Sequence, residues 1–478
     1  MEFKAWGNDK SLIKTNMRFF NRIIWTLLII SLFSCEGSTQ TLSREFKATL
    51  LQKTEIPTES IKNRSWFVVE DTQNELPKFR KNRRTIYKIR YPHNVDSVSF
   101  PTGSEVHFAG GSIKGMINFN DNYLSGEVNV RGAILKGSIR NKQFEAGWAC
   151  YGDSLHDDAF GVNQILNVCN TIHFQSGTYL MKDCHNIPES FPRKYKKKVI
   201  SHIGINRSNI VFIGDPGACI YTKDSLKTIC IYSTPKDLDH SIRGIKIEGM
   251  TFRNINDGLN FYEFEHTIKV AGVDGLEISN CQFHDFRGDA ICLSHLGNSV
   301  KSGELSRNSN VKIVGNYIEG SSHNNRNGIS VISGKNVLIE KNVIEETTKN
   351  NMPGSIDVEA NDSAYTIENI VITNNRIKGS NRCGIAIFST KKGSPANKIT
   401  IANNEIMDCS HGIRFFISST NLSGDILIKE NHIKNCKIPM SLIGYGKSKN
   451  WTFENNYLDG DDINKIPLKI DIDNLVMK

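Results

Sequence analysis

Two acidic residues alternate with two apolar residues in the segment "PGSIDVEAND" at positions 353–362. Such alternation is typical of a β-strand, in which successive side chains point to opposite faces. Asp357 and Glu359 are therefore expected on one face, where same-face neighbours lie roughly 6.5–7 Å apart. Two exposed carboxylates this close repel each other unless a calcium ion, a basic side chain or a shared proton lies between them. The pair is a candidate calcium site or a candidate pair for acid–base chemistry.

Further charged groups and histidines lie in or just before neighbouring strand-like segments. They are Lys269, Asp289, His295, Arg326, Arg382, His411 and Arg414. Phe388 and Phe416 are candidates for stacking against sugar rings. Each residue alone has an ordinary structural explanation, such as Asp289 in a turn or His411 packed at a bend. The hypothesis of a site depends on several successive segments placing these groups along one side of the fold.

These segments belong to a repeat that starts at about residue 240. Alternating apolar residues are followed by an asparagine, as in "VKIVGNYIEG" (311–320) and "IVITNNRIKG" (370–379). The asparagines are Asn316, Asn342, Asn375, Asn404, Asn431 and Asn456, at spacings of 26, 33, 29, 27 and 25 residues. Periods of about 20 to 50 residues indicate a solenoid or a propeller. The units are too short for four-stranded propeller blades of about 40 residues, so we predict a parallel β-helix with an internal ladder of buried asparagines.

A second strand follows in each repeat, and its alternation assigns side chains to two faces. The inward rows are Ile268/Val270, Ile291/Leu293, Ile329/Val331, Ile356/Val358, Ile385/Ile387 and Ile413/Phe415. One outward row is then Lys269, Cys292, Ser330, Asp357, Ala386 and Arg414, and the next contains Glu359, Phe388 and Phe416. Small residues such as Gly384 and Gly412 precede these strands and leave room for a bound chain.

Two more segments carry a family resemblance. "YGDSLHDDAFGVNQILNVCNTIHFQSGTYLM" (151–181) resembles the helix and strand at the entrance of known β-helix proteins, and "VHFAGGSIKGMINF" (106–119) resembles their strand-rich lead-in. With the repeats, these segments make residues 95–460 similar to the right-handed parallel β-helix, or pectate-lyase-like, superfamily. The resemblance implies an all-β, single-stranded right-handed parallel β-helix with a short N-terminal capping helix. The superfamily includes lyases, hydrolases, epimerases and adhesins, so it does not imply one reaction.

The N-terminal segment has the features of an export signal. In "MRFFNRIIWTLLIISLFSC", from Met17, two arginines precede a short apolar run. The run ends in a motif that resembles a bacterial lipobox, which implies cleavage before Cys35 and a lipid on its sulfur. We expect a signal over 1–35, a tether and lead-in over 36–94, the β-helix domain over 95–460 and a C-terminal cap over 461–478. The expected product is a monomeric exported lipoprotein of the cell surface or outer membrane, with the periplasm as an alternative.

The composition is that of an ordinary soluble protein with a positive charge. Hydrophobic residues make up 38%, charged residues 23%, and the net charge is +9. This balance favours an acidic partner, and no basic run is interleaved with aromatic residues, so nucleic acid is not expected. Membrane contact is expected only through the lipid anchor. Cys281, Cys409 and Cys436 follow strand-like runs and are predicted to be buried free thiols.

Our leading hypothesis is a polysaccharide lyase acting on a uronic-acid-containing chain, pectin-like or a glycosaminoglycan. β-Elimination requires cations to neutralise the uronate carboxylate and a base to remove the C5 proton. Lys269, Arg382 and Arg414 are candidates for the cations, and Lys269 or His295 for the base. Asp357 and Glu359 would hold calcium or orient the cations. Residues expected to bind substrate are Asp289, Arg326, Arg382, Phe388, His411 and Phe416.

Two alternatives remain open from the residues alone. A glycoside hydrolase needs two carboxylates, about 5–5.5 Å apart if retaining and roughly 6.5–9.5 Å if inverting. Asp357 and Glu359, or either with Asp289, suit these roles. A non-catalytic surface protein that binds glycan is the third hypothesis. Apart from calcium, no cofactor is expected.

Overall fold

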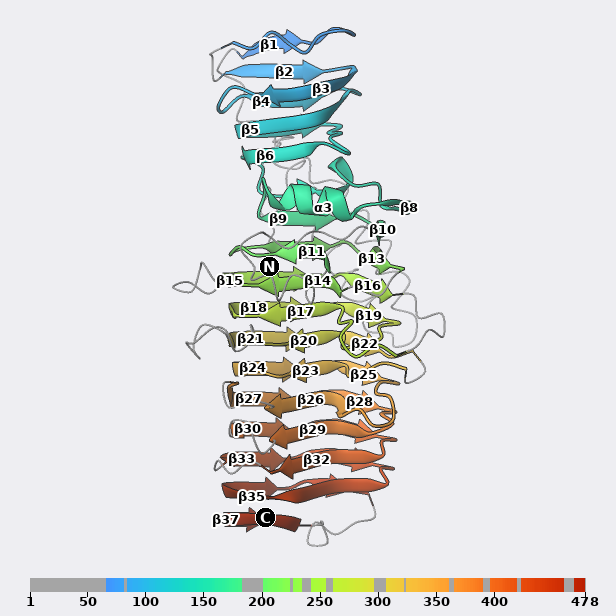
Figure 1. Ribbon diagram of the computed structural model, residues 1–478, viewed down its shortest axis with the longest axis vertical. Coiled ribbons are helices and arrows are strands. Elements are labelled where there is room, and N and C mark those ends of the chain that lie inside the picture. The colour runs from blue at the N-terminus through green and yellow to red at the C-terminus, as the bar shows by residue number, and fades with distance from the viewer. Residues whose placement is uncertain are drawn as a thin grey trace, which may run out of the picture. The chain divides into compact units, whose positions relative to one another are not determined.

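The computed structural model describes residues 66–80, 84–182, 201–223, 227–233, 242–254, 261–295, 307–321, 324–360, 365–389, 396–418, 423–459 and 468–477 (Figure 1). The predicted signal, lipidation residue Cys35 and tether over 36–60 lie outside these ranges and stay predictions. None of the described helices combines the length and apolarity needed to cross a bilayer.

The first strands form a small sheet in which every pairing is parallel. β1 (Phe67–Glu70), β2 (Thr85–Ile89), β4 (Glu105–Phe108) and β5 (Ser112–Gly126) follow one another, and β3 (Pro92–Ser99) and β6 (Ile134–Ile139) also pair with β5. The 3-10 helix η2 (Ala146–Trp148) and the helix α3 (Ala159–Leu166) come next. The predicted short helix is thus present, but eight strands precede it, and it packs against β6 and β11 (Ser201–Ile205).

The following strands form three parallel ladders in which each strand pairs with its equivalent one coil away. The ladder that carries the candidate site, here called the site face, contains β11, β14 (Lys227–Tyr232), β17 (Ile268–Ala271), β20 (Ile291–Leu293), β23 (Ile329–Val331), β26 (Gly354–Ala360), β29 (Cys383–Ser389) and β32 (His411–Ile417).

The second ladder contains β7 (Phe144–Glu145), β9 (Thr171–Phe174), β12 (Val211–Gly214), β15 (Ile242–Glu248), β18 (Val273–Ser279), β21 (Asn308–Val314), β24 (Gly334–Glu340), β27 (Ile367–Thr373), β30 (Ala396–Ala402) and β33 (Ser423–Lys429). The long β35 (Ile438–Glu454) pairs with both β32 and β33, and β37 (Leu468–Met477) pairs with β35.

The third ladder contains β8 (Asp153–Asp157), β10 (Gly177–Met181), β13 (Ala218–Thr222), β16 (Thr251–Asn254), β19 (Gln282–His284), β22 (Tyr317–Glu319), β25 (Val343–Glu345), β28 (Arg376–Lys378), β31 (Glu405–Met407), β34 (His432–Lys434) and β36 (Tyr457–Leu458). These parallel ladders confirm the predicted fold class, a mostly β parallel solenoid that has one short α-helix in its described part. The described strands run from Phe67 to Met477, whereas the predicted limits of the β-helix domain, 95 and 460, remain a prediction.

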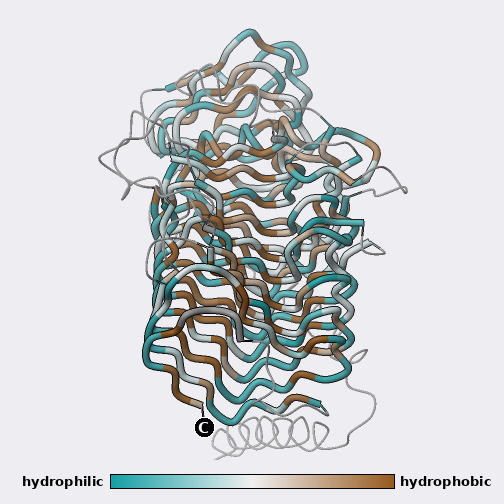
Figure 2. The backbone as a smooth tube through the Cα atoms, turned by 60° about the horizontal axis from the view of Figure 1, so that its bottom comes forward, coloured by the Kyte–Doolittle hydropathy of each residue, from teal (hydrophilic) through white to brown (hydrophobic). Residues whose placement is uncertain are grey.

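The predicted inward rows form the part of the core beneath the site face. Ile291, Ile329, Ile356 and Ile385 occupy successive coils in register, and all four are fully buried. Figure 2 shows apolar and polar positions alternating along the coils. Because the side-chain period of a strand is two, this register sends every intervening residue to the outer surface of the site face.

The repeated asparagines form the predicted buried ladder. The Nδ2 of Asn342 donates to Oδ1 of Asn375 at 2.9 Å, and Asn375 donates in the same way to Asn404 at 3.0 Å. The same bond links Asn316 to Asn342, Asn404 to Asn431 and Asn431 to Asn456. The first position of the ladder is taken by Cys281, whose backbone N–H donates to Asn316. Cys281 and Cys409 are buried free thiols as predicted, and Cys436 is a half-buried one.

Candidate functional site

The outward row of the site face has the register expected from the sequence. Lys269 pairs with Cys292, Cys292 with Ser330, Ser330 with Asp357, Asp357 with Ala386 and Ala386 with Arg414. The next row brings Glu359, Phe388 and Phe416 together in the same way. The alternation of the strands therefore placed all of these residues on the correct side of the sheet.

The expected exposure of the central acid is wrong. Asp357 is fully buried, and Glu359 retains 19% of its side-chain exposure. The cause is Arg326, which lies in the loop that enters β23 and extends across the row toward both acids. Asp357 and Glu359 therefore do not form an exposed acidic surface, because the Arg326 side chain from the preceding coil covers Asp357.

Arg326 is the centre of an ion network that joins three coils. Its Nη1 donates to both carboxylate oxygens of Asp289, at 3.2 and 3.0 Å, and to Ser330 Oγ at 3.1 Å. Its Nη2 donates to Glu359 Oε2 at 3.3 Å and lies 3.7 Å from Asp357 Oδ2. A calcium ion, a basic side chain or a shared proton could relieve the repulsion between Asp357 and Glu359. The structure shows the basic side chain, which is Arg326.

The buried acids differ in their readiness to ionise. Burial raises the pKa of Asp289, but the charge of Arg326 and the contact with His266 outweigh burial and lower it to about 2. Burial and the neighbouring Glu359 raise the pKa of Asp357 well above its ordinary value, against the opposing effect of Arg326. The difference has a geometric cause, because the guanidinium contacts Asp289 through two bonds and Asp357 only at 3.7 Å. A proton on Asp357 is thus favoured alongside the cation.

Calcium does not suit this arrangement. The position between Asp357 and Glu359 is taken by Nη2 of Arg326, and a second cation there would be repelled. In the described part of the chain, the donor atoms that converge within 4.8 Å belong to His266, Asp289 and Cys292. A thiol and an imidazole are ligands for zinc rather than calcium, and Asp289 already binds Arg326.

A second group of charged residues lies where β29 and β32 begin. Arg382 directly precedes β29, and its carbonyl accepts a 2.7 Å hydrogen bond from the N–H of His411, the first residue of β32. Arg414 is the outward residue three positions further on, and all three side chains are half-buried. Burial and the charges of Arg414 and Arg382 lower the pKa of His411 to about 4. The imidazole is therefore a neutral base at pH 7 beside two permanent cations.

Two polar atoms of this group lack hydrogen-bond partners. Among the residues that the structure describes, neither Nδ1 of His411 nor Nε of Arg414 has one, although both atoms are buried. Buried polar atoms are nearly always paired, so each such exception needs an explanation. A ligand would contact the solvent-exposed parts of these half-buried side chains rather than these two atoms.

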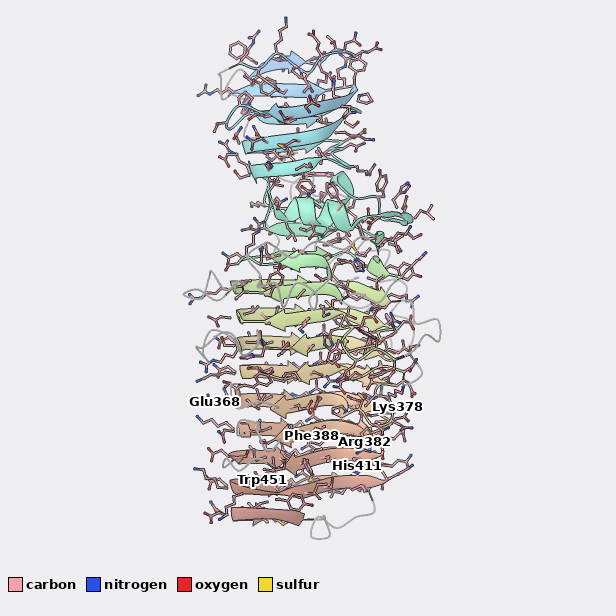
Figure 3. The ribbon with its side chains drawn as sticks, in the orientation of Figure 1. Glu368, Lys378, Arg382, Phe388, His411 and Trp451 are labelled. Atoms are coloured by element: carbon pink, nitrogen blue, oxygen red, sulfur yellow. The ribbon has the colours of Figure 1, made fainter. Side chains whose placement is uncertain are left out.

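Two phenylalanines lie on the outward row beside this group. The rings of Phe388 and Phe416 pack edge to face with centroids 6.2 Å apart, and both side chains are half-buried. In Figure 3, Arg382 and His411 lie at the start of β29 and β32, and Phe388 lies further along β29. Cations, a neutral imidazole and aromatic rings therefore share one stretch of the site face.

The two residues proposed as the base lie apart from this stretch. Lys269 is three coils from Asp357 and five from Arg414, which corresponds to about 14 and 24 Å along the stack. Lys269 and Arg414 therefore cannot act on the same bond. His295 lies two residues beyond the end of β20, where its ring is 4.6 Å from that of Tyr365. Neither residue joins Arg382, His411 and Arg414.

The strand alternation also missed several members of the ion network. Glu263 lies 3.6 Å from Arg326, and Glu265 accepts a 2.7 Å hydrogen bond from Arg287. Asn327 bridges Ser330 and Asp357 with bonds of 2.9 and 3.2 Å. All lie in loops that enter the site face, where no periodicity indicates a direction. The acids spaced two apart in "YEFEH" (262–266) were the available signal.

Comparison with known proteins supports the architecture. Residues 304–466 match the family described as right handed beta helix region, which covers about a third of the chain. No match is found among the curated proteins. Similar solved structures include the Streptococcus pneumoniae surface protein and adhesin PfbA, at 14% identity over 70% of this chain and 97% of that one, with a TM-score of 0.41.

Two other similar structures are of enzymes. The family 28 exopolygalacturonase of Yersinia enterocolitica is 11% identical over 70% of this chain and 78% of that one, with a TM-score of 0.43. The A-module of the Azotobacter vinelandii mannuronan C-5 epimerase AlgE4 is 10% identical over 70% and 97%, with a TM-score of 0.38. At these values the likenesses assign no activity to this chain.

Proposed function

We propose that this protein is a lyase that cleaves a uronic-acid-containing polysaccharide by β-elimination at the start of β29 and β32. The observation that carries the proposal is the half-buried imidazole of His411, which burial and the charges of Arg414 and Arg382 keep neutral at pH 7. These are the groups that elimination requires, namely cations for the uronate carboxylate and a base for the adjacent carbon.

The reaction follows from these roles. Arg382 and Arg414 bind the carboxylate and stabilise the negative charge that develops on it when the C5 proton leaves. His411 accepts that proton, the C5–H electrons form the C4–C5 double bond, and the C4–O4 bond breaks. O4 takes a proton from the imidazolium when both lie on one face of the sugar, and otherwise from water. Phe388 and Phe416 offer apolar surface to the neighbouring sugar rings.

The ion network has a supporting role in this proposal. Arg326 and Asp289 are buried and paired with each other, so they do not reach a substrate directly. They hold Asp357 and Glu359 on the coil next to Arg382. Lys269 and His295, which the sequence suggested as the base, lie too far from the two arginines to act on the same bond.

The experiment is a screen of polygalacturonate, alginate and glycosaminoglycans, read by ultraviolet absorbance and reducing ends together. A lyase creates a conjugated double bond, so both signals rise in wild type. We expect His411→Ala and Arg414→Ala each to lower kcat/KM by about 10²-fold or more. Arg376→Ala, an exposed arginine on β28 in another ladder, is the matched control and should retain full activity. Full activity in both site variants would exclude this site.

Hydrolysis is the second candidate because of one specific observation. Asp357 has a raised pKa, as a general acid needs, and Glu359 lies beside it, but Asp357 is fully buried and would reach a sugar only if Arg326 moved away. Their oxygens lie 3.7 and 3.3 Å from the same nitrogen, so they are at most roughly 7 Å apart, which suits a carboxylate pair. A hydrolase would raise reducing ends without ultraviolet absorbance, and Glu359→Gln would then abolish the reaction. Binding of a polysaccharide without either signal would indicate a non-catalytic glycan-binding protein.

A further inference from the structure

The loop that enters β17 presents aromatic side chains beside the ion network. Its residues Tyr262 and Phe264 are 53% and 60% exposed. Single exposed apolar residues are common on protein surfaces and need no explanation. Tyr262 and Phe264, however, flank Glu263 of the network on the same face as the candidate site. Two large exposed aromatic residues in this position are a more specific indication of a binding surface.

Ion pairs hold this loop beside the network. Glu263 lies 3.6 Å from Arg326, and Glu265 accepts a bond from Arg287 at 2.7 Å, while its carbonyl accepts the N–H of Gly288 at 3.0 Å. A turn at these residues is closed by the N–H of Glu265, which donates to the carbonyl of Tyr262 at 3.3 Å. The ion pairs hold this turn beside the network, and the exposure of Tyr262 and Phe264 shows that both rings face solvent.

A basic residue extends this surface toward the catalytic groups. The Nζ of Lys349, in the loop before β26, lies 4.8 Å from the centre of the Phe261 ring. Lys349 is exposed and so remains able to meet an anionic chain. Aromatic rings and a cation therefore lie between β17 and β26, on the side of Asp357 opposite to Arg414.

We propose that Tyr262 and Phe264 form a remote sugar-binding subsite for the acidic polysaccharide, an inference that rests on the proposed function. The apolar face of a pyranose ring stacks on an aromatic ring, and the tyrosine hydroxyl can bond a sugar hydroxyl. β17 is four coils from β29, or about 19 Å along the stack. A polymer can therefore occupy this subsite and the catalytic groups together, whereas a disaccharide cannot.

The distance between the proposed subsite and the catalytic groups allows a kinetic test. In Tyr262→Ala/Phe264→Ala, KM for the polymer should rise about tenfold with kcat little changed. Both constants for a disaccharide-length substrate should stay at wild-type values. Tyr262→Phe keeps the ring and should retain most of the polymer affinity. Tyr445→Ala removes another aromatic residue, 89% exposed on β35, and should change nothing.

Binding distinguishes failure of the subsite from failure of the proposed reaction. In affinity electrophoresis through polygalacturonate, alginate or a glycosaminoglycan, wild type and Tyr445→Ala should be retarded and the double variant should not. That result without cleavage would support the subsite and overturn the lyase. Equal retardation and equal KM in the double variant and Tyr445→Ala would overturn the subsite. A wild type that is neither retarded nor active on any of these polymers would overturn both.

Discussion

Arg326 donates to both carboxylate oxygens of Asp289, at 3.2 and 3.0 Å, and both residues are buried. They come from the loops that enter β23 and β20, so this pair links two coils above the outward row. Since the same guanidinium also contacts Asp357 and Glu359, one side chain balances the charge of all three acids.

Removal of that side chain should be costly. We expect Arg326→Met to lower the free energy of unfolding by about 3–5 kcal/mol, because it leaves Asp289 buried and ionised without its partner. Urea unfolding monitored by circular dichroism measures the loss. Arg376→Met breaks only exposed contacts with Glu345 and Glu405 and should cost less than about 1 kcal/mol. Equal losses in the two variants would show that the network adds no stability.

Neutralisation of Asp357, in contrast, should not lower the free energy of unfolding at pH 8. Because its folded-state pKa is raised, the folded chain binds more protons than the unfolded chain from about pH 4 upward, and stability falls as pH rises through the folded pKa. Asp357→Asn keeps an acceptor for Asn327 and should be at least as stable as wild type at pH 8. Its stability should also lack the decrease with rising pH that Asp357 causes in wild type. Asp425→Asn, at an exposed acid, is the control. A variant less stable than wild type at pH 8 would contradict the raised pKa.

The pH profile of the reaction should report His411. With its folded pKa lowered to about 4, the imidazole stays neutral well below the ordinary value of about 6.5. The acid limb of kcat/KM should therefore lie near pH 4, because activity is lost only when the base is protonated. Arg382→Gln removes one neighbouring charge, so the limb should move to higher pH. A wild-type limb near pH 6.5, or no shift in the variant, would argue against His411 as the base.

The asparagine ladder should stabilise the fold through pairs of side chains. Asn375→Leu and Asn404→Leu should each lower the free energy of unfolding by about 1–3 kcal/mol, since each leaves buried partners unsatisfied. The bond of 3.0 Å between Asn375 and Asn404 predicts that their effects are not additive. A double-mutant cycle measured by urea unfolding tests this. Strict additivity would indicate that the two asparagines act independently.

Chelation should leave the protein unaffected. Because Arg326 lies between Asp357 and Glu359, we expect neither kcat nor Tm to change in excess chelator. Both are measured on wild type before and after dialysis, with added calcium as the control. Loss of activity that calcium restores would revive the calcium hypothesis for this acidic pair.

Several features followed from local properties of the sequence. Alternation with period two predicted the inward aliphatic rows and the register that joins Asp357 to Ala386 and Arg414. The recurring asparagine predicted the ladder, because a buried amide in a stacked repeat can pair with its own equivalent. These properties belong to single strands and are repeated along the chain, so no knowledge of distant contacts was needed.

Only the tertiary structure decided which outward residues are accessible and which act together. Asp357 and Arg414 belong to the same row, but Arg326 from another coil covers Asp357, whereas Arg414 remains half-buried beside His411. The direction of a loop side chain follows no period, and the pKa of a buried group depends on charges brought close by folding. The sequence by itself therefore determined the solenoid and the outward row, and the packing of its loops decided where a neutral imidazole, two cations and an acid of raised pKa lie.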